Sequence, residues 1–467
     1  MFCFNKIEQF SSKIALINEN NKTVSYAELI RDADAISEKI GGRCLVFLMC
    51  HNCIESVAGY IGFLRNKIVP VMINEQIDAD LLSNLLESYH PAYFFLPESK
   101  AIEIDGTKIY SYGEYTLVKL NYDIDYALAD ELALLLTTSG STGSPKLVRQ
   151  SYKNIEANTD SIIKYLNIGS DDNAITTLPM SYTYGLSIIN SHLCAGASII
   201  LNEFTLMDKK FWALLKTHKA TTFGGVPYTY EMLKKLRFGR MDLPTLRYIT
   251  QAGGKLSKEL SSEFSEICEK KGIEFIVMYG QTEATARMSY LPWEYAKTKA
   301  GSMGIAIPGG SFWLSDTDGN RIEEPDVTGE LMYCGDNVTL GYAQSRHDLC
   351  RPDENCGTLR TGDMAKRDAD GFYYIVGRKK RFLKLFGNRV NLDEVEGLLK
   401  QQGYECACAG VDDCLKIYIT DANYADGVMR FITEHTAINR AGVKIVFINQ
   451  IPRNESGKVL YSALEAE

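Results

Sequence analysis

The chain has 467 residues, of which 45% are hydrophobic, and its formal net charge at pH 7 is -9. This length suits one large domain with a smaller one, and the acidic balance argues against a nucleic-acid partner. No apolar run is long enough to span a membrane, and no signal peptide is evident. Twelve cysteines without a disulfide framework fit a reducing compartment, so we expect a cytoplasmic protein.

Residues 1–130 alternate between helical and strand-like segments. Ser25, followed three residues later by Glu28, forms a capping box that predicts a helix running to about Lys39. Strand-like apolar runs follow at 44–49, 68–72 and 93–96. This alternation predicts parallel strands covered by helices.

One pair of cysteines has the spacing of a metal or redox motif. Cys50 and Cys53 form a single CxxC after the apolar run 44–49. A single pair without a second one is a weak signal for either function, so we interpret both as ordinary reduced thiols.

The stretch 132–146 starts as an apolar run typical of a buried strand and continues as a loop of Ser, Thr and Gly. Glycines let backbone N–H groups point toward one centre, which suits an oxyanion such as phosphate, and Lys146 adds a positive charge. The loop is not a Walker A motif, because Pro145 precedes the lysine. On composition alone, a phosphate site and a solvated surface loop both remain open.

The order Thr-Ser-Gly-Ser-Thr-Gly-x-Pro-Lys after an apolar strand resembles the signature loop of the adenylate-forming superfamily. This superfamily includes acyl-CoA synthetases, nonribosomal-peptide adenylation domains and beetle luciferases. Leu147 is a departure, because the family usually has Gly after the lysine. The resemblance implies that the loop binds the phosphates of ATP. The implied ligands are Thr138, Ser139, Gly140, Ser141, Thr142, Gly143 and Lys146.

An aromatic, polar turn follows a strand-like segment at 175–186. In the family this place shapes the acyl pocket, which implies that Tyr182, Thr183 and Tyr184 line it. Tyrosines that pack a helix start are the alternative. Amino-acid-activating members have an Asp here, and 181–187 has none, so we expect no α-amino acid as substrate. A narrow, polar pocket favours a neutral or hydroxylated acid of modest size over a long fatty acid.

Two further strand-to-turn segments carry paired glycines. Gly224 and Gly225 occupy one, and Gly253 and Gly254 occupy the next. Paired glycines after a strand let a flat ligand approach the backbone, although ordinary turns look the same. The resemblance assigns the first pair to the substrate pocket and the second pair to the nucleotide site.

The second strong motif is Tyr-Gly-Gln-Thr-Glu at the end of an apolar strand that begins at Phe275. Ligands of open α/β sheets bind at the carboxyl ends of strands, and a carboxylate there suits Mg²⁺. Tyr-Gly-x-Thr-Glu matches the family. The match implies that Tyr279 and Gly280 hold adenine, that Thr282 contacts the α-phosphate and that Glu283 binds Mg²⁺. A Thr that caps a helix with Glu in its first turn is the alternative.

A β-rich segment follows and leads to Thr-Gly-Asp at 361–363. An acidic group after a tight turn can accept both hydroxyls of a ribose, and the resemblance assigns this function to Asp363. The resemblance also places Arg378 at the ribose and Lys380 at a hinge between two domains. Lys384 falls in the segment that lines the thiol tunnel in the family. The basic run 378–384 otherwise reads as a solvated linker.

The tail contains Pro-Arg-Asn-Glu-Ser-Gly-Lys at 452–458. A lysine on a Gly-containing loop can reach a distant anion. The resemblance implies that Lys458 serves the adenylation step, whereas a surface lysine would be the ordinary interpretation.

Members of the family often have an acidic residue directly after the hinge, and Arg381 departs from that pattern.

The resemblance covers essentially the whole chain, and five motifs appear in the order that the family has. We therefore predict an α/β fold in which residues 1–377 form a large amino-terminal domain of parallel-rich sheets with helices plus a β-rich subdomain. Residues 378–467 are predicted to form a small, mobile α+β domain, with the hinge near Lys380.

The resemblance implies an ATP- and Mg²⁺-dependent ligase that makes an acyl-adenylate from a small carboxylic acid. A thiol would then accept the acyl group, either CoA or the phosphopantetheine of a separate acyl carrier protein. Two alternatives stay open: transfer of the acyl group to an amine, and a non-catalytic nucleotide-binding homologue. The presence of Glu283, Asp363, Arg378 and Lys458 disfavours the second alternative.

Overall fold

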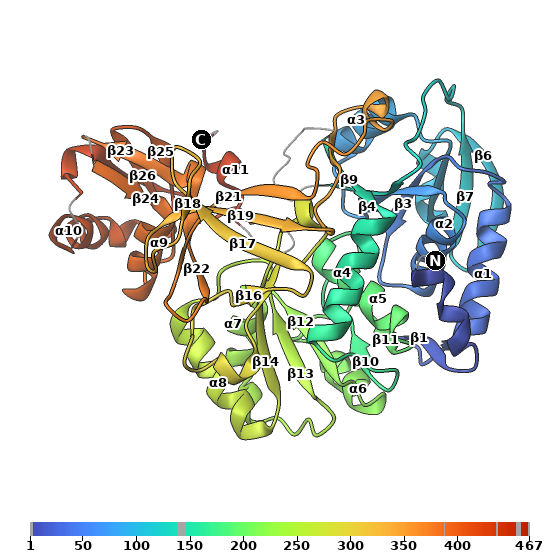
Figure 1. Cartoon of the computed structure of the whole chain (residues 1–467), viewed down its shortest axis with the longest axis horizontal. Helices are drawn as coiled ribbons and strands as arrows, with labels where there is room; N and C mark the ends of the chain where they lie inside the picture. Colours follow the sequence, from blue (N-terminus) through green and yellow to red (C-terminus); the bar gives the residue numbers. More distant parts are fainter. Residues whose placement is uncertain (1–2, 138–145, 387, 436–437, 454–458, 466–467) are drawn as a thin grey trace. The chain divides into compact units, whose positions relative to one another are not determined.

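The computed structural model describes residues 3–137, 146–386, 388–435, 438–453 and 459–465 (Figure 1). The chain divides into two compact units, Met1–Ser311 with Cys334–Leu359 and Phe312–Tyr333 with Arg360–Glu467. The second unit therefore contains part of the predicted β-rich subdomain together with the predicted small domain. The boundary near residue 377 stays a prediction.

The first unit contains a nine-stranded sheet with a parallel centre. Its strand order is β16-β15-β14-β13-β12-β10-β11-β1-β2, and neighbours from β14 through β1 run parallel. The antiparallel strands lie at the two ends of the sheet. The strands are β1 Ile14–Asn18, β2 Thr23–Ser25, β10 Asn173–Ile175, β11 Ser198–Leu201, β12 Thr222–Gly225, β13 Tyr248–Gln251, β14 Glu274–Tyr279, β15 Ser289–Tyr290 and β16 Ile305–Ala306.

The same unit contains an eight-stranded sheet in the order β20-β9-β8-β4-β3-β5-β7-β6. Its central strands β8, β4, β3 and β5 run parallel, and three of them fall on the predicted runs 44–49, 68–72 and 93–96. The strands are β3 Leu45–Cys50, β4 Val69–Asn74, β5 Tyr93–Pro97, β6 Gly106–Tyr112, β7 Tyr115–Leu120, β8 Leu132–Thr137, β9 Leu147–Ser151 and β20 Gly341–Ala343.

Helices cover both faces of the eight-stranded sheet. Alternate residues of β3 pack into different cores: Leu48 lies with α2, α4 and α5, and Phe47 lies on the opposite face with α3. Burial on both faces is typical of parallel strands. The helices of this unit are α1 Tyr26–Glu38, α2 Ile54–Arg65, α3 Ala79–Tyr89, α4 Tyr152–Tyr165, α5 Thr183–Cys194, α6 Lys209–Thr217, α7 Pro227–Lys235 and α8 Lys258–Lys271.

Helix α1 begins where the sequence predicts. The side chain of Ser25 accepts a hydrogen bond from the backbone N–H of Glu28, and the carboxylate of Glu28 accepts one from the backbone N–H of Ser25. This confirms the capping box of α1. One core connects α1, α2, α4 and α5 with strands of both sheets, and Figure 1 shows α4 and α5 between the strands of the two sheets.

The second unit combines a five-stranded sheet in the order β18-β17-β19-β21-β22, a hairpin of β23 and β24, and a three-stranded sheet of β25, β26 and β27. Its elements are β17 Gly310–Ser315, β18 Arg321–Ile322, β19 Gly329–Gly335, β21 Thr358–Arg367, β22 Tyr373–Arg378, β23 Phe382–Leu385, β24 Asn388–Asn391, α9 Leu392–Gln401, β25 Cys406–Val411, β26 Cys414–Ile419, α10 Ala425–His435, β27 Val443–Phe447 and α11 Tyr461–Glu465. The predicted α/β fold with a small α+β part is confirmed. In the part of the chain that is described, no helix is long and apolar enough to cross a membrane.

The CxxC segment joins the two sheets of the first unit through its histidine. His51 follows β3, its Nε2 lies 2.6 Å from a carboxylate oxygen of Glu75 after β4, and its Nδ1 lies 3.1 Å from Glu203 after β11. Burial opposes the charge on the imidazole, but the hydrogen bond to Glu203 and the charges of both glutamates raise the pKa of His51 overall. Burial also raises the pKa of Cys50 and Cys53, which fits their interpretation as thiols.

We expect His51→Gln to lower the free energy of unfolding by roughly 0.5–1 kcal/mol near pH 6, because these ion pairs are partly exposed. The folded-state pKa of His51 is raised, so its contribution is complete below the ordinary value of about 6.5 and is lost as pH rises through the folded value. The pKa of Glu203 is lowered by the hydrogen bond from His51, so the contribution is also lost when acid protonates Glu203. Denaturant unfolding over a pH series measures the effect.

The control is His347→Gln, which replaces an exposed histidine. A cost for His51→Gln that is the same at about pH 6 and pH 9 would contradict the ion-pair explanation.

Candidate active site

The predicted phosphate loop connects two strands that pair with each other. In the antiparallel pair β8 and β9, Thr137 lies opposite Leu147. Residues 138–145, which include six of the predicted phosphate ligands, lie outside the described residues. Lys146 is therefore the predicted loop ligand whose contacts can be described.

One phenol brings the lysine of the loop and the carboxylate of the second motif together. The Nζ of Lys146 lies 3.3 Å from the ring centroid of Tyr342, and the hydroxyl of Tyr342 donates a hydrogen bond of 2.7 Å to Oε1 of Glu283. Burial and the negative charge of Glu283 raise the pKa of Tyr342, so the phenol stays a donor. The other oxygen of Glu283 accepts no hydrogen bond from the residues that the structure describes. A carboxylate with an oxygen that is open among the described residues, on the same phenol as the lysine that ends the predicted phosphate loop, fits a Mg²⁺ ligand.

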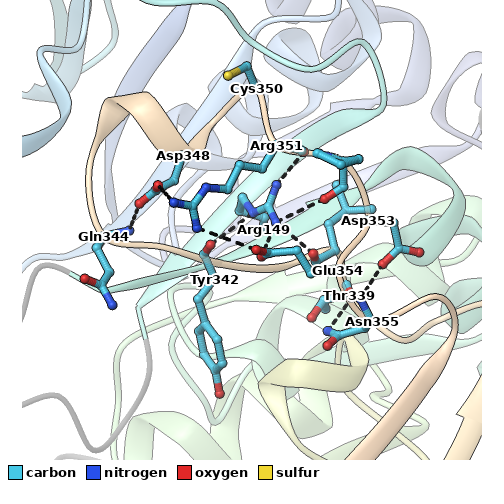
Figure 2. A network of polar contacts seen from close by, with 12 residues as sticks. Arg149, Thr339, Tyr342, Gln344, Asp348, Cys350, Arg351, Asp353, Glu354 and Asn355 are labelled. Carbon is cyan, nitrogen blue, oxygen red and sulfur yellow. Dashed lines mark hydrogen bonds and ion pairs between the residues drawn. The ribbon is translucent and has the colours of Figure 1, made fainter.

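The strand that carries Tyr342 is held by a buried arginine, as Figure 2 shows. Arg149 of β9 is fully buried. It donates to the backbone carbonyls of Leu340 at 2.8 Å, Tyr342 at 3.2 Å and Arg351 at 2.6 Å, and to the carboxylate of Glu354 at 2.6 Å. These bonds fix β20 against the strand that leaves the phosphate loop, and they fix the backbone from which Tyr342 projects.

The backbone around Glu283 is fixed by side chains. Thr339 donates to the carbonyl of Glu283 from its N–H at 3.0 Å and from its hydroxyl at 2.9 Å. Thr285 has a φ of 65°, an uncommon value for a β-branched residue, and its hydroxyl donates to the carbonyl of Asn337 at 2.7 Å. The hydroxyl of Thr183 donates to the carbonyl of Thr285. Thr183 therefore connects the predicted substrate segment to the predicted metal-binding motif.

The predicted nucleotide residues of this motif lie at the end of β14, where Tyr279 is its last residue, and just beyond it. A side chain at Gly280 would place Cβ 1.8 Å from the carbonyl oxygen of Ala286, so only glycine fits. The hydroxyl of Tyr279 accepts a hydrogen bond from Gln281 at 3.1 Å. Thr282 begins the short 3-10 turn that carries Glu283.

Two of the predicted glycines make room for the predicted tyrosines. A Cβ at Gly224 would lie 2.8 Å from the hydroxyl of Tyr184, and a Cβ at Gly253 would lie 2.6 Å from the hydroxyl of Tyr182. The Tyr184 hydroxyl also shares a hydrogen bond of 2.8 Å with Thr250. Burial raises the pKa of Tyr184 to about 12, so its hydroxyl stays neutral.

The other two glycines face the start of α7. A Cβ at Gly225 would lie 2.6 Å from Thr229, and a Cβ at Gly254 would lie 3.0 Å from Pro227. These four glycines let the ends of β12 and β13 approach the tyrosines and α7 closely.

In the second unit the two predicted ribose ligands are neighbours. Asp363 of β21 pairs with Arg378 of β22, and its carboxylate lies 3.5 Å from the guanidinium Nε. The Asp363 side chain is buried, and its backbone N–H donates to the hydroxyl of Thr361 at 3.1 Å. The side chains of Lys380 and Lys384 lie outside the described residues, as does Lys458. Arg453 pairs with Val459 across the segment that contains Lys458.

Arg381, the departure after the predicted hinge, has a structural explanation within the second unit. Its guanidinium contacts Asp393 at 2.5 Å and Glu396 at 2.6 Å, and it lies 3.6 Å from the ring centroid of Tyr461. The Tyr461 hydroxyl also donates to Glu396 at 3.1 Å. An arginine here joins the start of α9 to α11, which an acidic residue would not do.

A cavity of about 480 Å³ opens at the start of α4, lined by Tyr152, Asn154, Asp336 and Asp353 among others. None of the residues predicted for the site lines it, so we do not include it in the candidate site.

Sequence reasoning missed three residues of this region. In the sequence, Tyr342 is one residue of a Gly-Tyr pair, Arg149 is a charge shortly after the predicted phosphate loop, and Arg287 follows the second motif. Nothing in the sequence places Tyr342 beside Glu283, because the two lie in segments that are distant along the chain.

Comparisons with known proteins identify the family. Residues 3–343 match the model of a family described as AMP-binding enzyme. The chain is similar to 2-succinylbenzoate–CoA ligase of Geobacillus sp. (strain WCH70), with 28% identity over 438 residues that cover 88% of this chain and 84% of that protein. It is also similar to indoleacetate–CoA ligase of Aromatoleum aromaticum, with 29% identity over 479 residues that cover 94% of this chain and 92% of that protein.

Among solved structures, O-succinylbenzoate coenzyme A synthetase from Bacillus subtilis, in complex with ATP and magnesium ion, shares the fold. The TM-score is 0.81, the identity is 22%, and the match covers 99% of each chain.

We expect Tyr342→Phe to weaken Mg²⁺–ATP binding about tenfold or more, because a hydrogen bond to a charged group contributes about 1.5–3 kcal/mol. The ring remains in this variant, so Lys146 keeps its contact. Calorimetric titration with ATP at several Mg²⁺ concentrations measures the change. Tyr333→Phe, which alters a buried tyrosine of the second unit, serves as the control. Equal affinities for Tyr342→Phe and the unchanged protein would contradict a positioning function.

Proposed function

We propose that this chain, which belongs to the AMP-binding enzyme family, is an AMP-forming ligase that joins a carboxylic acid to a thiol through an acyl-adenylate. The observation that carries the proposal is the contact of Tyr342 with both Lys146 and Glu283. Through this contact, Lys146 at the end of the predicted phosphate loop and Glu283, the predicted metal ligand, both bind the side chain of Tyr342. This arrangement suits a nucleoside triphosphate with its metal ion.

In the first step, an oxygen of the substrate carboxylate attacks the α-phosphorus of ATP. The new acyl–phosphate bond forms while the bond to pyrophosphate breaks. Both reactants are anions, so positive charge must offset their repulsion. Mg²⁺ at Glu283 would supply Lewis-acid stabilisation. We assign the leaving phosphates to the 138–146 loop, the α-phosphate contact to Thr282, and the transition-state cation to Lys458.

In the second step, a thiolate attacks the acyl carbon and AMP leaves. Asp363 and Arg378 are proposed to retain the ribose through both steps. Arg378 lies close enough to Asp363 to orient its carboxylate. Lys384 is proposed to lie in the segment that admits the thiol. A small domain that changes orientation between the steps would present Lys458 first and Lys384 second.

CoA is the acceptor that the relatives favour, because two of them are named as CoA ligases. The phosphopantetheine of a separate carrier protein carries the same thiol and is the second candidate. Transfer to an amine remains the alternative if neither thiol consumes the adenylate.

The twelve cysteines are free thiols, and we place the protein in the cytoplasm on that basis.

The acid is proposed to be of modest size, neither an α-amino acid nor a long fatty acid. The segment 181–187 has no acidic side chain for a substrate ammonium, and an unpaired buried ammonium is strongly disfavoured. The hydroxyls of Tyr182 and Tyr184 lie close to Gly253 and Gly224, so a long chain bound over these glycines would have to displace the tyrosines.

We expect Lys458→Ala to lower the rate of adenylate formation by about 10²–10³-fold while thioester formation from supplied acyl-adenylate continues. The physical reason is that this lysine would stabilise charge only in the first transition state. Pyrophosphate release and thioester formation are measured separately. Lys444→Ala, which changes an exposed lysine of the same unit, is the control. Equal losses in both half-reactions would count against the assignment.

A pyrophosphate-release screen should give its fastest turnover with a short or aryl acid rather than an amino acid or a long-chain acid. The screen covers short, hydroxy, aryl and long-chain acids, with CoA, a carrier protein and an amine as acceptors. Highest activity with an α-amino acid or a long fatty acid would exclude the proposed substrate class. Adenylate that only an amine consumes would favour the amide-ligase alternative.

A further inference from the structure

Arg287 is a buried cation that the proposed mechanism does not use. It is 2% exposed and lies four residues after Glu283. Its Nε donates to the hydroxyl of Ser187 at 3.2 Å, and its Nη1 contacts the hydroxyl of Tyr165 at 3.2 Å and the sulfur of Met278 at 3.0 Å. These partners are all neutral. The second amino nitrogen, Nη2, donates to none of the residues that the structure describes.

Two other arginines of the same unit show how this protein normally compensates such a charge. Arg149, which is also fully buried, has the carboxylate of Glu354 at 2.6 Å in addition to backbone carbonyls. Arg247 lies 4.6 Å from a tyrosine ring and contacts the carboxylate of Asp172 at 2.7 Å. Arg287 lies 4.9 Å from the ring of Tyr184 and has no carboxylate within ion-pair distance among the described residues.

A guanidinium remains charged at any accessible pH, so it cannot escape burial by losing its proton. Removing a charge from water costs several kcal/mol, and neutral hydroxyls with one aromatic ring return only part of that cost. An uncompensated buried cation is therefore expected where a ligand supplies the anion. The buried charge lowers the stability of the unliganded protein, and an anionic ligand that binds the guanidinium restores that stability.

The position of Arg287 indicates which ligand this is. Its guanidinium contacts Tyr184, and Tyr184 in turn packs over Gly224, both of which are predicted to line the acyl pocket. Ser187, its hydrogen-bond partner, ends the predicted substrate segment 181–187 and also lines a polar cavity of about 10 Å³, which has room for about one water molecule. Arg287 thus belongs to the acid side of the site.

We propose that Arg287 binds a second carboxylate on the acid substrate, so that the enzyme activates a dicarboxylic acid and leaves the distal carboxylate unreacted. This inference rests on the proposed ligase function and deepens it. A planar guanidinium with one unused amino group matches a carboxylate. The prediction of a neutral or hydroxylated acid from the sequence does not consider Arg287. We replace that prediction with an acid that carries a second, unreacted carboxylate.

The test compares acids that differ only in the distal group: butyrate with succinate, hexanoate with adipate, and p-toluate with terephthalate. The protein as it exists is assayed by pyrophosphate release. For at least one pair, kcat/KM should be about tenfold or more higher for the diacid. In Arg287→Gln the ratio of diacid to neutral acid should fall by about 30-fold or more. In Arg247→Gln, whose arginine already has a carboxylate partner, the ratio should not change.

Thermal unfolding separates binding from a structural function. Arg287→Gln should keep or raise the Tm of the unliganded protein, because it removes an uncompensated charge, whereas Arg247→Gln should lower the Tm. The preferred diacid should raise the Tm of the unchanged protein and not that of Arg287→Gln. Arg287→Lys, which keeps the charge, should retain part of the preference for the diacid.

Several results would overturn the inference. If only the neutral acids were turned over, the inference about Arg287 would be wrong and the proposed ligase function would remain intact. An equal loss on both acids of a pair in Arg287→Gln would show that Arg287 holds the shared reacting carboxylate or only supports the fold. The same ratio in Arg287→Lys and Arg287→Gln would show that the charge is not the cause. No pyrophosphate with any acid would overturn the ligase function and this inference together.

Discussion

The candidate site of the first unit depends on the hydrogen bonds of one buried guanidinium. Arg149 binds backbone carbonyls on both sides of β20 and the carboxylate of Glu354 (Figure 2). Without Arg149 these carbonyls would each lose a charged donor, and without Glu354 the buried guanidinium would lose its carboxylate partner. The arginine therefore fixes where β20 begins and ends. Because Tyr342 lies in β20, the same bonds determine where its ring contacts Lys146 and where its hydroxyl binds Glu283.

A second constraint acts on the backbone rather than on charges. Thr285 adopts a positive φ, and Gly280 has no space for a side chain because the chain turns back against Ala286. The hydroxyl of Thr183 holds the carbonyl of Thr285 from the neighbouring helix α5. Strain of this kind persists only where surrounding contacts determine the conformation, and such places are typical of functional sites. The predicted acyl segment and the predicted metal motif are therefore joined by a direct hydrogen bond.

The sequence predicted those features that depend on neighbours along the chain. The capping box at Ser25 follows from local hydrogen bonding, and the strands β3, β4 and β5 follow from continuous apolar runs. The motif around Glu283 could be found because its residues are consecutive.

Contacts between distant segments could not be predicted in this way. Tyr342 and Glu283 are separated by 59 positions, and Arg149 and Glu354 by 205. The functions of Arg287 and Arg381 also depend on which acidic groups the fold brings near them. A list of residue types cannot distinguish the paired Arg381 from the unpaired Arg287.

The close contacts between glycines and tyrosines have an evolutionary consequence. Gly224 leaves no space for a methyl group beside the Tyr184 hydroxyl, and Gly253 leaves none beside that of Tyr182. A larger residue at Gly224 therefore requires Tyr184 and Ile188 to shift or to be replaced by smaller residues, whereas at Gly253 the φ of 80° disfavours any other residue whatever faces it. Gly224 and Tyr184 should therefore change together as the family diversifies, so new acid specificities would arise by two-step exchanges between β12 and α5.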